Sequence, residues 1–145
     1  MNAKSNEMPW KLTSPTAVFT LILVAFTLFL GLRAHLDPLG AAKAFGLSLV
    51  SPEDAGWLHT KGGRDLAIGL ALLALVVTRQ RLASGLFVLA SVLMPVTDAL
   101  TVVSHGASLG FALSVHGSAA VYGVALGAAL LKRPSKATDR TPAHA

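Results

Sequence analysis

The chain has 145 residues, of which 53% are hydrophobic and only 13% are charged, whereas charged residues make up about 25% of an average soluble protein. This composition excludes a soluble enzyme and a nucleic-acid-binding domain, despite the net charge of +5. Cysteine is absent, which also excludes a disulfide scaffold and thiol redox chemistry. We therefore expect an integral membrane protein whose main partner is the lipid bilayer.

The first expected span covers residues 15–32 and follows a short N-terminal segment, residues 1–14. Between Lys11 and Arg33 the chain has 21 residues without a charge, and about 20 apolar residues cross the core of a bilayer. A cleaved signal peptide is the alternative interpretation of this stretch. The apolar run is longer than a signal core, however, and no small-x-small cleavage pattern precedes Arg33.

The connection after the first span contains the start and stop signals of a short helix. Asp37 followed by Pro38 is typical of a helix cap and a first-turn proline, and Gly46 is typical of a helix end. We therefore predict a helix over Pro38–Phe45 that lies at the outer membrane interface.

The second span needs residues that are not apolar. The uncharged run Leu66–Thr78 has only 13 residues, which is too short to cross a membrane at about 1.5 Å per residue. The span must therefore begin near Trp57, and this places Lys61, Arg64 and Asp65 inside the helix or in its first turns.

Two further spans follow from an almost uncharged stretch. Between Leu82 and Leu131 the one charged residue is Asp98. Glycine and serine residues at 104–110 predict a turn that divides this stretch into spans over 82–103 and 109–131. Short loops make neighbouring helices antiparallel, so the sequence predicts an all-α, four-helix transmembrane bundle over residues 15–131.

The positions of lysine and arginine predict that both termini are cytoplasmic. Four basic residues fall on the other side of the membrane, and eight fall on the side of the termini: Lys4, Lys11, Arg79, Arg81, Lys132, Arg133, Lys136 and Arg140. By the positive-inside rule this pattern indicates a multi-pass protein, and we expect it in a bacterial plasma membrane, with its basic face against anionic lipid. Trp10 and Trp57 fall at opposite interfaces, where they are expected to anchor the bundle. The polar tail, residues 132–145, is predicted to be disordered.

A row of small residues lies along the fourth expected span, and it includes Gly123 and Gly127 at the spacing of a Gly-xxx-Gly motif. We favour packing within the subunit as the role of this row. A homodimer through Gly123 and Gly127 is the alternative.

Ionisable residues gather in the outer halves of the expected spans. Asp98 and His116 are predicted at similar depth on adjacent helices, where they could share an outward-facing polar pocket as candidate catalytic, proton-handling groups. Pro95 predicts a bend one turn before Asp98, because proline has no backbone N–H. The candidate binding residues are Arg33, Lys61, Arg64, Asp65 and His105.

Two interpretations of these charges remain open. The pocket could bind or transform a small amphipathic or anionic molecule, which leaves open whether the protein is an enzyme. Alternatively, the charges could pair into an ionic lock in a non-catalytic accessory or assembly subunit. Asp98, His105 and His116 have the ligand types of a metal site, but their spacing is not diagnostic. We therefore predict no metal and no cofactor.

Several short motifs occur in a fixed order: Gly31-Leu32-Arg33, Asp37-Pro38, Phe45-Gly46-Leu47, Lys61-Gly62-Gly63-Arg64-Asp65, Pro95 with Asp98, His105-Gly106 and His116-Gly117. This order resembles the pattern of the small membrane proteins of domain-of-unknown-function family 4267 over roughly residues 16–131. The resemblance implies a four-span integral membrane protein and no agreed activity. The chain is also similar in size to the small multidrug exporters. It lacks their membrane-embedded glutamate in the first span, which counts against proton-coupled export.

Overall fold

A computed structural model describes residues 10–132, and the regular structure in this range is entirely helical. The predicted disorder of the tail beyond Lys132 lies outside the described residues, as does most of the N-terminal segment. In chain order the elements are α1 (Pro15–Leu36), α2 (Pro38–Phe45), the 3-10 helix η1 (Pro52–Ala55), α3 (Gly56–Val77), α4 (Arg81–Ser91), α5 (Leu93–Ser104), α6 (Leu109–Ala112), the π-helix η2 (Leu113–Gly117) and α7 (Ser118–Leu131).

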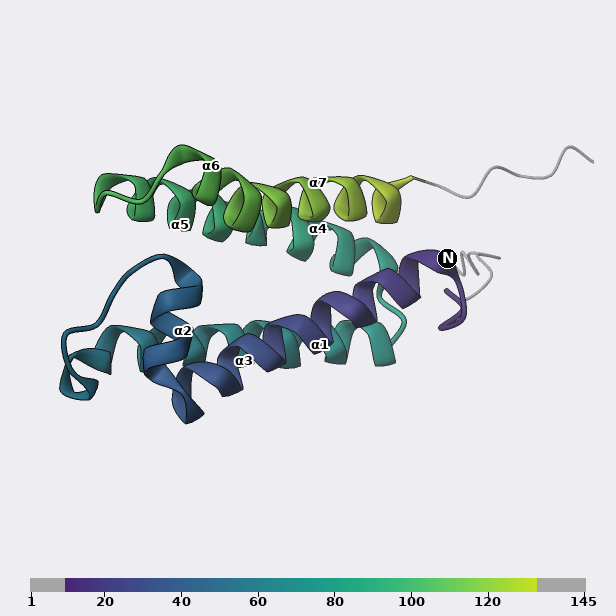
Figure 1. The fold of residues 1–145 in the computed structure, drawn as a ribbon. Helices are drawn as coiled ribbons and strands as arrows, with labels where there is room; N and C mark the ends of the chain where they lie inside the picture. The colour runs from purple at the N-terminus through teal and green to yellow at the C-terminus, as the bar shows by residue number, and fades with distance from the viewer. Residues whose placement is uncertain (1–9, 133–145) are drawn as a thin grey trace, which may run out of the picture.

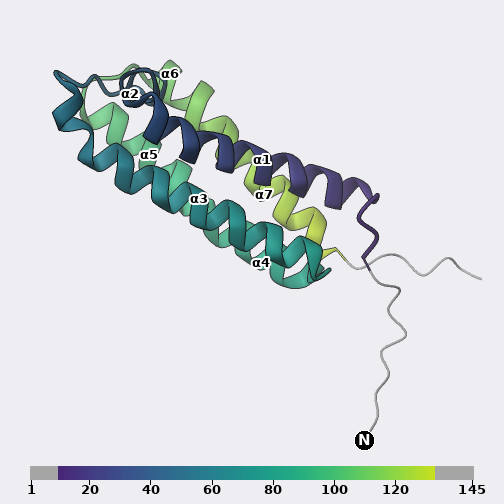
Figure 2. The same cartoon turned by 90° about the horizontal axis from the view of Figure 1, so that it is seen from below.

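The long helices form two pairs that lie against each other (Figures 1 and 2). In one pair α1 packs along α3, and in the other α4 packs along α7. The short helix α2 lies at one end of the molecule, while the described chain begins and ends at the other (Figures 1 and 2). A connection between the pairs is made by the turn from α3 to α4.

Three helical segments are long and apolar enough to cross a membrane: Pro15–Leu36, Arg81–Ser104 and Leu109–Leu131. These segments indicate a membrane protein. Helix α3 has 22 residues but does not meet the same measure, because every stretch of spanning length within it contains Lys61, Arg64 and Asp65. The structure thus supports an all-helical protein with three apolar helices of spanning length.

The crossing of α1 and α3 depends on residues without side chains. A Cβ atom added at Gly31 would lie 2.8 Å from the carbonyl oxygen of Gly62, and one added at Gly62 would lie 2.8 Å from the Cβ atom of Ala34. These separations leave no room for a side chain. The backbones of α1 and α3 therefore lie in close contact, as in other membrane proteins whose helices meet at small residues.

Helix α2 has the bounds that the sequence predicts. The Asp37 side chain caps its start by accepting a hydrogen bond from the Gly40 N–H at 2.9 Å. Gly46 ends the helix with a φ angle of 100°, a left-handed conformation that favours glycine. Local sequence signals at both ends thus fix this helix.

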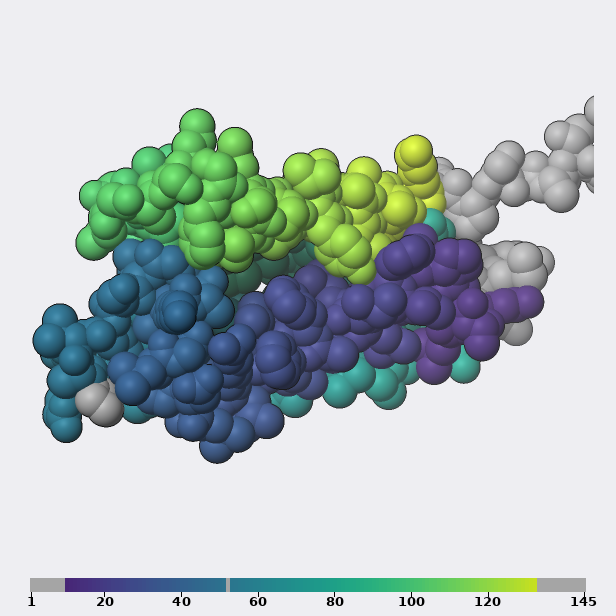
Figure 3. All heavy atoms as spheres, viewed as in Figure 1, coloured from purple at the N-terminus to yellow at the C-terminus, as the bar shows by residue number. Residues whose placement is uncertain are grey.

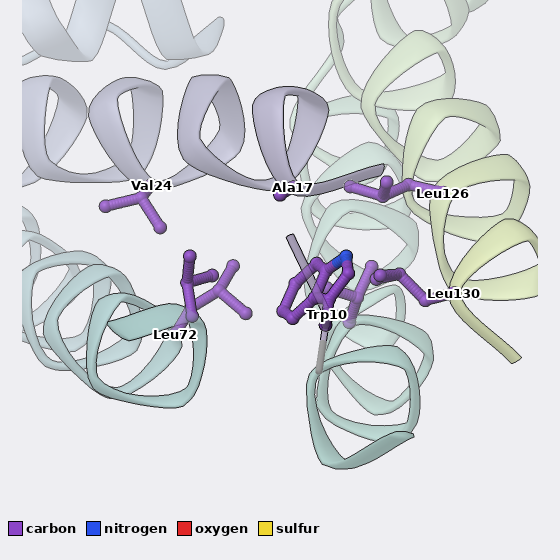
Figure 4. Packing of buried hydrophobic residues seen from close by; sticks show 8 residues of the cluster. Trp10, Ala17, Val24, Leu72, Leu126 and Leu130 are labelled. Atoms are coloured by element: carbon purple, nitrogen blue, oxygen red, sulfur yellow. The ribbon is translucent and has the colours of Figure 1, made fainter. Parts of the chain in front are cut away.

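Trp10 is not the lipid anchor that the sequence suggests. Its side chain is only 8% exposed, and its indole N–H donates a 3.0 Å hydrogen bond to the Thr16 hydroxyl group. Figure 4 shows the indole ring inside the bundle, close to Leu126 and Leu130 of α7. Residues 10–14 therefore fold back under the helices and close this end of the core.

Two irregular turns interrupt the second helix pair. The α4–α5 rod is broken at Val92, three residues before Pro95, as expected where proline removes a backbone donor. The facing rod contains η2, a π-helical turn that the sequence analysis does not predict. Turns of this kind are rare and occur frequently at functional sites.

The row of small residues on α7 packs within the chain. A Cβ atom at Gly123 would lie 2.7 Å from Cγ2 of Val92, and one at Gly127 would lie 2.6 Å from Cγ of Leu89. Both glycines are buried by the α4–α5 rod. The predicted packing role therefore accounts for them, and a homodimer through this row has no support.

Candidate functional site

A cavity of about 550 Å³ lies between the two helix pairs. Its volume falls within the range of about 300–1,000 Å³ that is usual for ligand pockets. Apolar side chains from α1, α2, α3 and the second pair supply most of the wall. The ionisable side chains that line it are Arg33, Asp65, Asp98, His116 and Tyr122.

The cavity opens sideways between α1 and α7. Ile22 and Phe26 of α1 line it and are also 52% and 50% exposed on the outer surface of the bundle. Ala119 lines it from α7 and is likewise exposed. The space-filling view shows the surface hollowed between these two helices (Figure 3). The rim of this opening is apolar, which suits contact with lipid.

Helix α2 closes the end of the cavity that is remote from the chain termini. Ala41, Ala44 and Phe45 of α2 all line the cavity. The Phe45 ring packs against the imidazole of His116 with 4.9 Å between ring centroids, and against the indole of Trp57 with 5.4 Å. Phe45 therefore contacts both helix pairs, and this links α2 to each of them.

His116 lies in the π-helical turn and is only 6% exposed. Its Nε2 atom is 2.9 Å from the backbone carbonyl oxygen of Phe45. Because a carbonyl oxygen can only accept, Nε2 carries the proton of this hydrogen bond. In the neutral ring the other nitrogen, Nδ1, is then an acceptor, and it has no hydrogen-bond partner among residues 10–132.

Two ion pairs bring charges to the cavity wall, and each joins residues one helical turn apart. Lys61 Nζ lies 2.6 Å from Asp65 Oδ2, and both side chains are only 14% exposed. Arg33 Nε lies 3.7 Å from Asp37 Oδ2, and Arg33 Nη2 donates a 3.2 Å hydrogen bond to the Gly40 carbonyl oxygen. Both pairs are thus made within one helix or at its end.

Asp98 is the exception among the charged residues of the wall. It lies on α5 one turn beyond Pro95 and is partly buried. Within the described part of the chain its carboxylate takes part in no hydrogen bond and no ion pair. The groups that act on it electrostatically come from two elements: Lys61, Arg64 and Asp65 on α3, and His116 on η2.

The structure brings together some of the predicted site residues and separates others. Arg33, Asp65, Asp98 and His116 line the cavity. Lys61 reaches the site through its ion pair with Asp65 and lies 5.4 Å from the centre of the Phe45 ring. Arg64 is exposed and lies outside the cavity wall.

His105 also lies apart, at the end of α5. It is exposed, its Nδ1 atom is 2.8 Å from the Thr101 carbonyl oxygen, and it lines a second, shallower depression. Within residues 10–132 no three His, Asp or Glu side chains are grouped as ligands of a metal ion.

Two residues of this wall, Tyr122 and Phe45, are not among the candidate site residues that the sequence predicts. Tyr122 of α7 lines the same cavity as His116, six residues after it. Phe45 was expected only as the last residue of α2. Its place in the Phe45-Gly46-Leu47 motif is the feature of the sequence that could have indicated a role at the site.

The arrangement defines a helical membrane protein with an apolar cavity between two helix pairs. Among known families, the model described as "Domain of unknown function (DUF4267)" matches residues 24–130, which is well over half of the chain. The chain therefore belongs to this family, as the order of its motifs indicated. A search of curated proteins and a search of solved structures found no similar protein.

Proposed function

We propose that this protein is an integral membrane protein that binds a small amphipathic molecule in the cavity between its helix pairs. The observation that carries the proposal is the form of the cavity. It has an apolar rim at Ile22 and Phe26, facing the side of the bundle, and polar groups at Asp98 and His116. An amphipathic molecule in the lipid has this same division between an apolar body and a polar end.

The proposal includes α3 as a fourth span. Helix α3 has the same length as α1, 22 residues each, and packs along it. The ion pair between Lys61 and Asp65 neutralises two of its three charges. Long cationic side chains near a helix end can also extend to the interface, and Arg64 is exposed in that manner. These features support a membrane position for α3.

The orientation belongs to the same proposal. With four spans both termini lie on one side, and the eight basic residues of that side support a cytoplasmic position against anionic lipid. The cavity end covered by α2 then faces the outer side of the membrane. A ligand would enter from the outer leaflet through the gap between α1 and α7, with its polar end toward Asp98 and His116, the candidate proton-handling groups.

The test is to fill the cavity. The protein is placed in lipid nanodiscs, and its Tm is measured with octylamine, 1-octanol and octanoate, three probes that share one chain and differ in the head group. We expect at least one probe to raise the Tm of the wild type, because a ligand that binds only the folded state stabilises it. The stabilisation should be lost in Ala119→Phe, whose added ring occupies the cavity.

Val121→Phe is the matched control, because Val121 is 70% exposed and is not part of the cavity wall. It should retain the stabilisation seen in the wild type. Absence of stabilisation by all three probes would contradict the proposal, as would equal stabilisation of Ala119→Phe. Either result would leave the accessory or assembly subunit as the better interpretation.

A further inference from the structure

One charge on the cavity wall lacks a direct partner. Asp65 is neutralised by Lys61 at 2.6 Å, and Arg33 lies 3.7 Å from Asp37. Asp98 has no ion-pair partner among residues 10–132. One carboxylate is therefore left without a direct counter-charge in a mostly apolar cavity.

Two polar groups at this end of the cavity have free hydrogen-bond acceptors. The Asp98 carboxylate is an acceptor, and so is Nδ1 of the nine-tenths buried His116, because its Nε2 proton is already donated to the Phe45 carbonyl oxygen. Arg33 directs Nε and Nη2 toward Asp37 and the Gly40 carbonyl oxygen. A ligand that supplies donors and positive charge complements these atoms better than an anion does.

We propose that the molecule bound in this cavity is a cationic amphiphile, an alkyl or aryl ammonium compound whose head group pairs with Asp98 and donates a hydrogen bond to Nδ1 of His116. This inference rests on the proposed function and names its ligand class. The apolar body of such a molecule would lie along Leu72 and Phe87, which line the cavity, and would reach Phe26 at its rim.

Lys61 and Arg64 are the basic residues of α3 that act on the Asp98 carboxylate electrostatically. Arg64 is exposed and lies outside the cavity wall. The Lys61 Nζ atom is held at 2.6 Å by Asp65 and lies 5.4 Å from the centre of the Phe45 ring. The Lys61 ammonium group therefore already has two interaction partners, the Asp65 carboxylate and the Phe45 ring. An ammonium group that enters the cavity meets Asp98 without breaking the Lys61–Asp65 pair.

The physical reason for the preference is the cost of a lone charge in the membrane. An ionised carboxylate within a span is costly unless it is paired or reaches water. An ammonium ligand removes this cost when it binds. An octanoate ion would instead bring a second negative charge next to Asp98, and 1-octanol would bring a donor but no charge.

The experiment compares the three octyl probes on the same nanodisc-embedded protein. Affinity is obtained from the dependence of Tm on probe concentration, with empty nanodiscs used to correct for partition into lipid. We expect octylamine to bind the wild type at least about tenfold more tightly than 1-octanol, and octanoate to bind most weakly. In Asp98→Asn the difference between octylamine and 1-octanol should fall to less than about twofold.

The matched control is Glu53→Gln, which removes a carboxylate charge from an exposed residue of η1 and should leave the tenfold preference unchanged. Equal or tighter binding of 1-octanol or octanoate by the wild type would overturn this inference and leave the proposed function intact. Binding of none of the probes would instead overturn the proposed function. The comparison of head groups uses the wild type alone, so it decides the inference even if Asp98→Asn fails to fold.

Discussion

The Tyr122 hydroxyl group donates a 2.8 Å hydrogen bond to the backbone carbonyl oxygen of Phe19 and so joins α7 to α1. This bond crosses between the two helix pairs beside the opening of the cavity. Tyr122→Phe removes it and keeps the ring, so we expect the free energy of unfolding to fall by about 0.5–1.5 kcal/mol. Reversible unfolding in mixed micelles measures this change.

Ser118→Ala is the control for that variant. The Ser118 hydroxyl group donates to carbonyl oxygens of its own helix, at Ser114 and Val115. Its loss should therefore change stability less than the loss of the bond between Tyr122 and Phe19. Equal losses of unfolding free energy in the two variants would mean that the bond between Tyr122 and Phe19 does not stabilise the packing of α7 on α1.

A second prediction separates a binding site from an ionic lock. Asp98 has no partner in the described structure, so Asp98→Asn should leave the Tm unchanged or raise it. Asp65→Asn should lower stability, by up to about 3 kcal/mol, because it leaves the largely buried Lys61 ammonium unpaired. Thermal unfolding of both variants in the same nanodiscs measures the difference. A large loss in Asp98→Asn would favour the lock.

A third prediction concerns the row of small residues on α7. Gly127→Val should destabilise the protein by about 1–3 kcal/mol, because the new side chain would collide with Leu89 of α4. The oligomeric state, measured by light scattering in detergent, should be the same as in the wild type. Gly110→Val is the control, since a Cβ atom there meets nothing within 4 Å. A wild-type dimer that Gly127→Val dissociates would contradict this interpretation.

The fourth prediction tests the position of Trp10. Trp10→Ala removes a buried side chain that packs with Leu130, and it should cost about 3–5 kcal/mol of stability. Trp57→Ala should cost less, because Trp57 is partly exposed and contacts Phe45 near the surface. Chemical unfolding in micelles measures both losses. Small and equal losses of stability in the two variants would contradict the buried position of Trp10 and favour a role as a lipid anchor.

The fifth prediction is that reporter domains fused to the two termini will both report the cytoplasm. Eight basic residues on that side carry the orientation signal. Reporters on opposite sides would mean that α3 does not cross the membrane and that three spans is the correct number.

Local signals in the sequence were sufficient for those elements whose ends are set by neighbouring residues. Helix α2 has its predicted bounds because Asp37 and Gly46 act within one turn of it. The break near Pro95 is of the same kind, since it follows from one missing backbone N–H. The long apolar helices were equally accessible, because hydropathy is a property of composition.

Features that depend on contacts between distant residues could not be predicted in this way. The burial of Trp10 requires four helix ends to meet around it, and the π-helical turn is stabilised by a hydrogen bond from His116 to Phe45, 71 residues away. Tyr122 also lies on the cavity wall, with its hydroxyl group bonded to Phe19 of α1. The sequence indicated which ionisable residues gather near one end, but not that Arg64 and His105 lie apart from the others.

The two ends of the cavity are closed in different ways, one by the hydrophobic core and the other by a short helix. The end near the chain termini is sealed by the densely packed cluster around Trp10, Leu126 and Leu130. The far end is covered by an eight-residue helix that the His116 hydrogen bond to Phe45 fastens to the second pair. Exchange through the Trp10 end would require the core to come apart. The closed Trp10 end therefore supports the proposed entry between α1 and α7, and it argues against a passage through the bundle from one face of the membrane to the other.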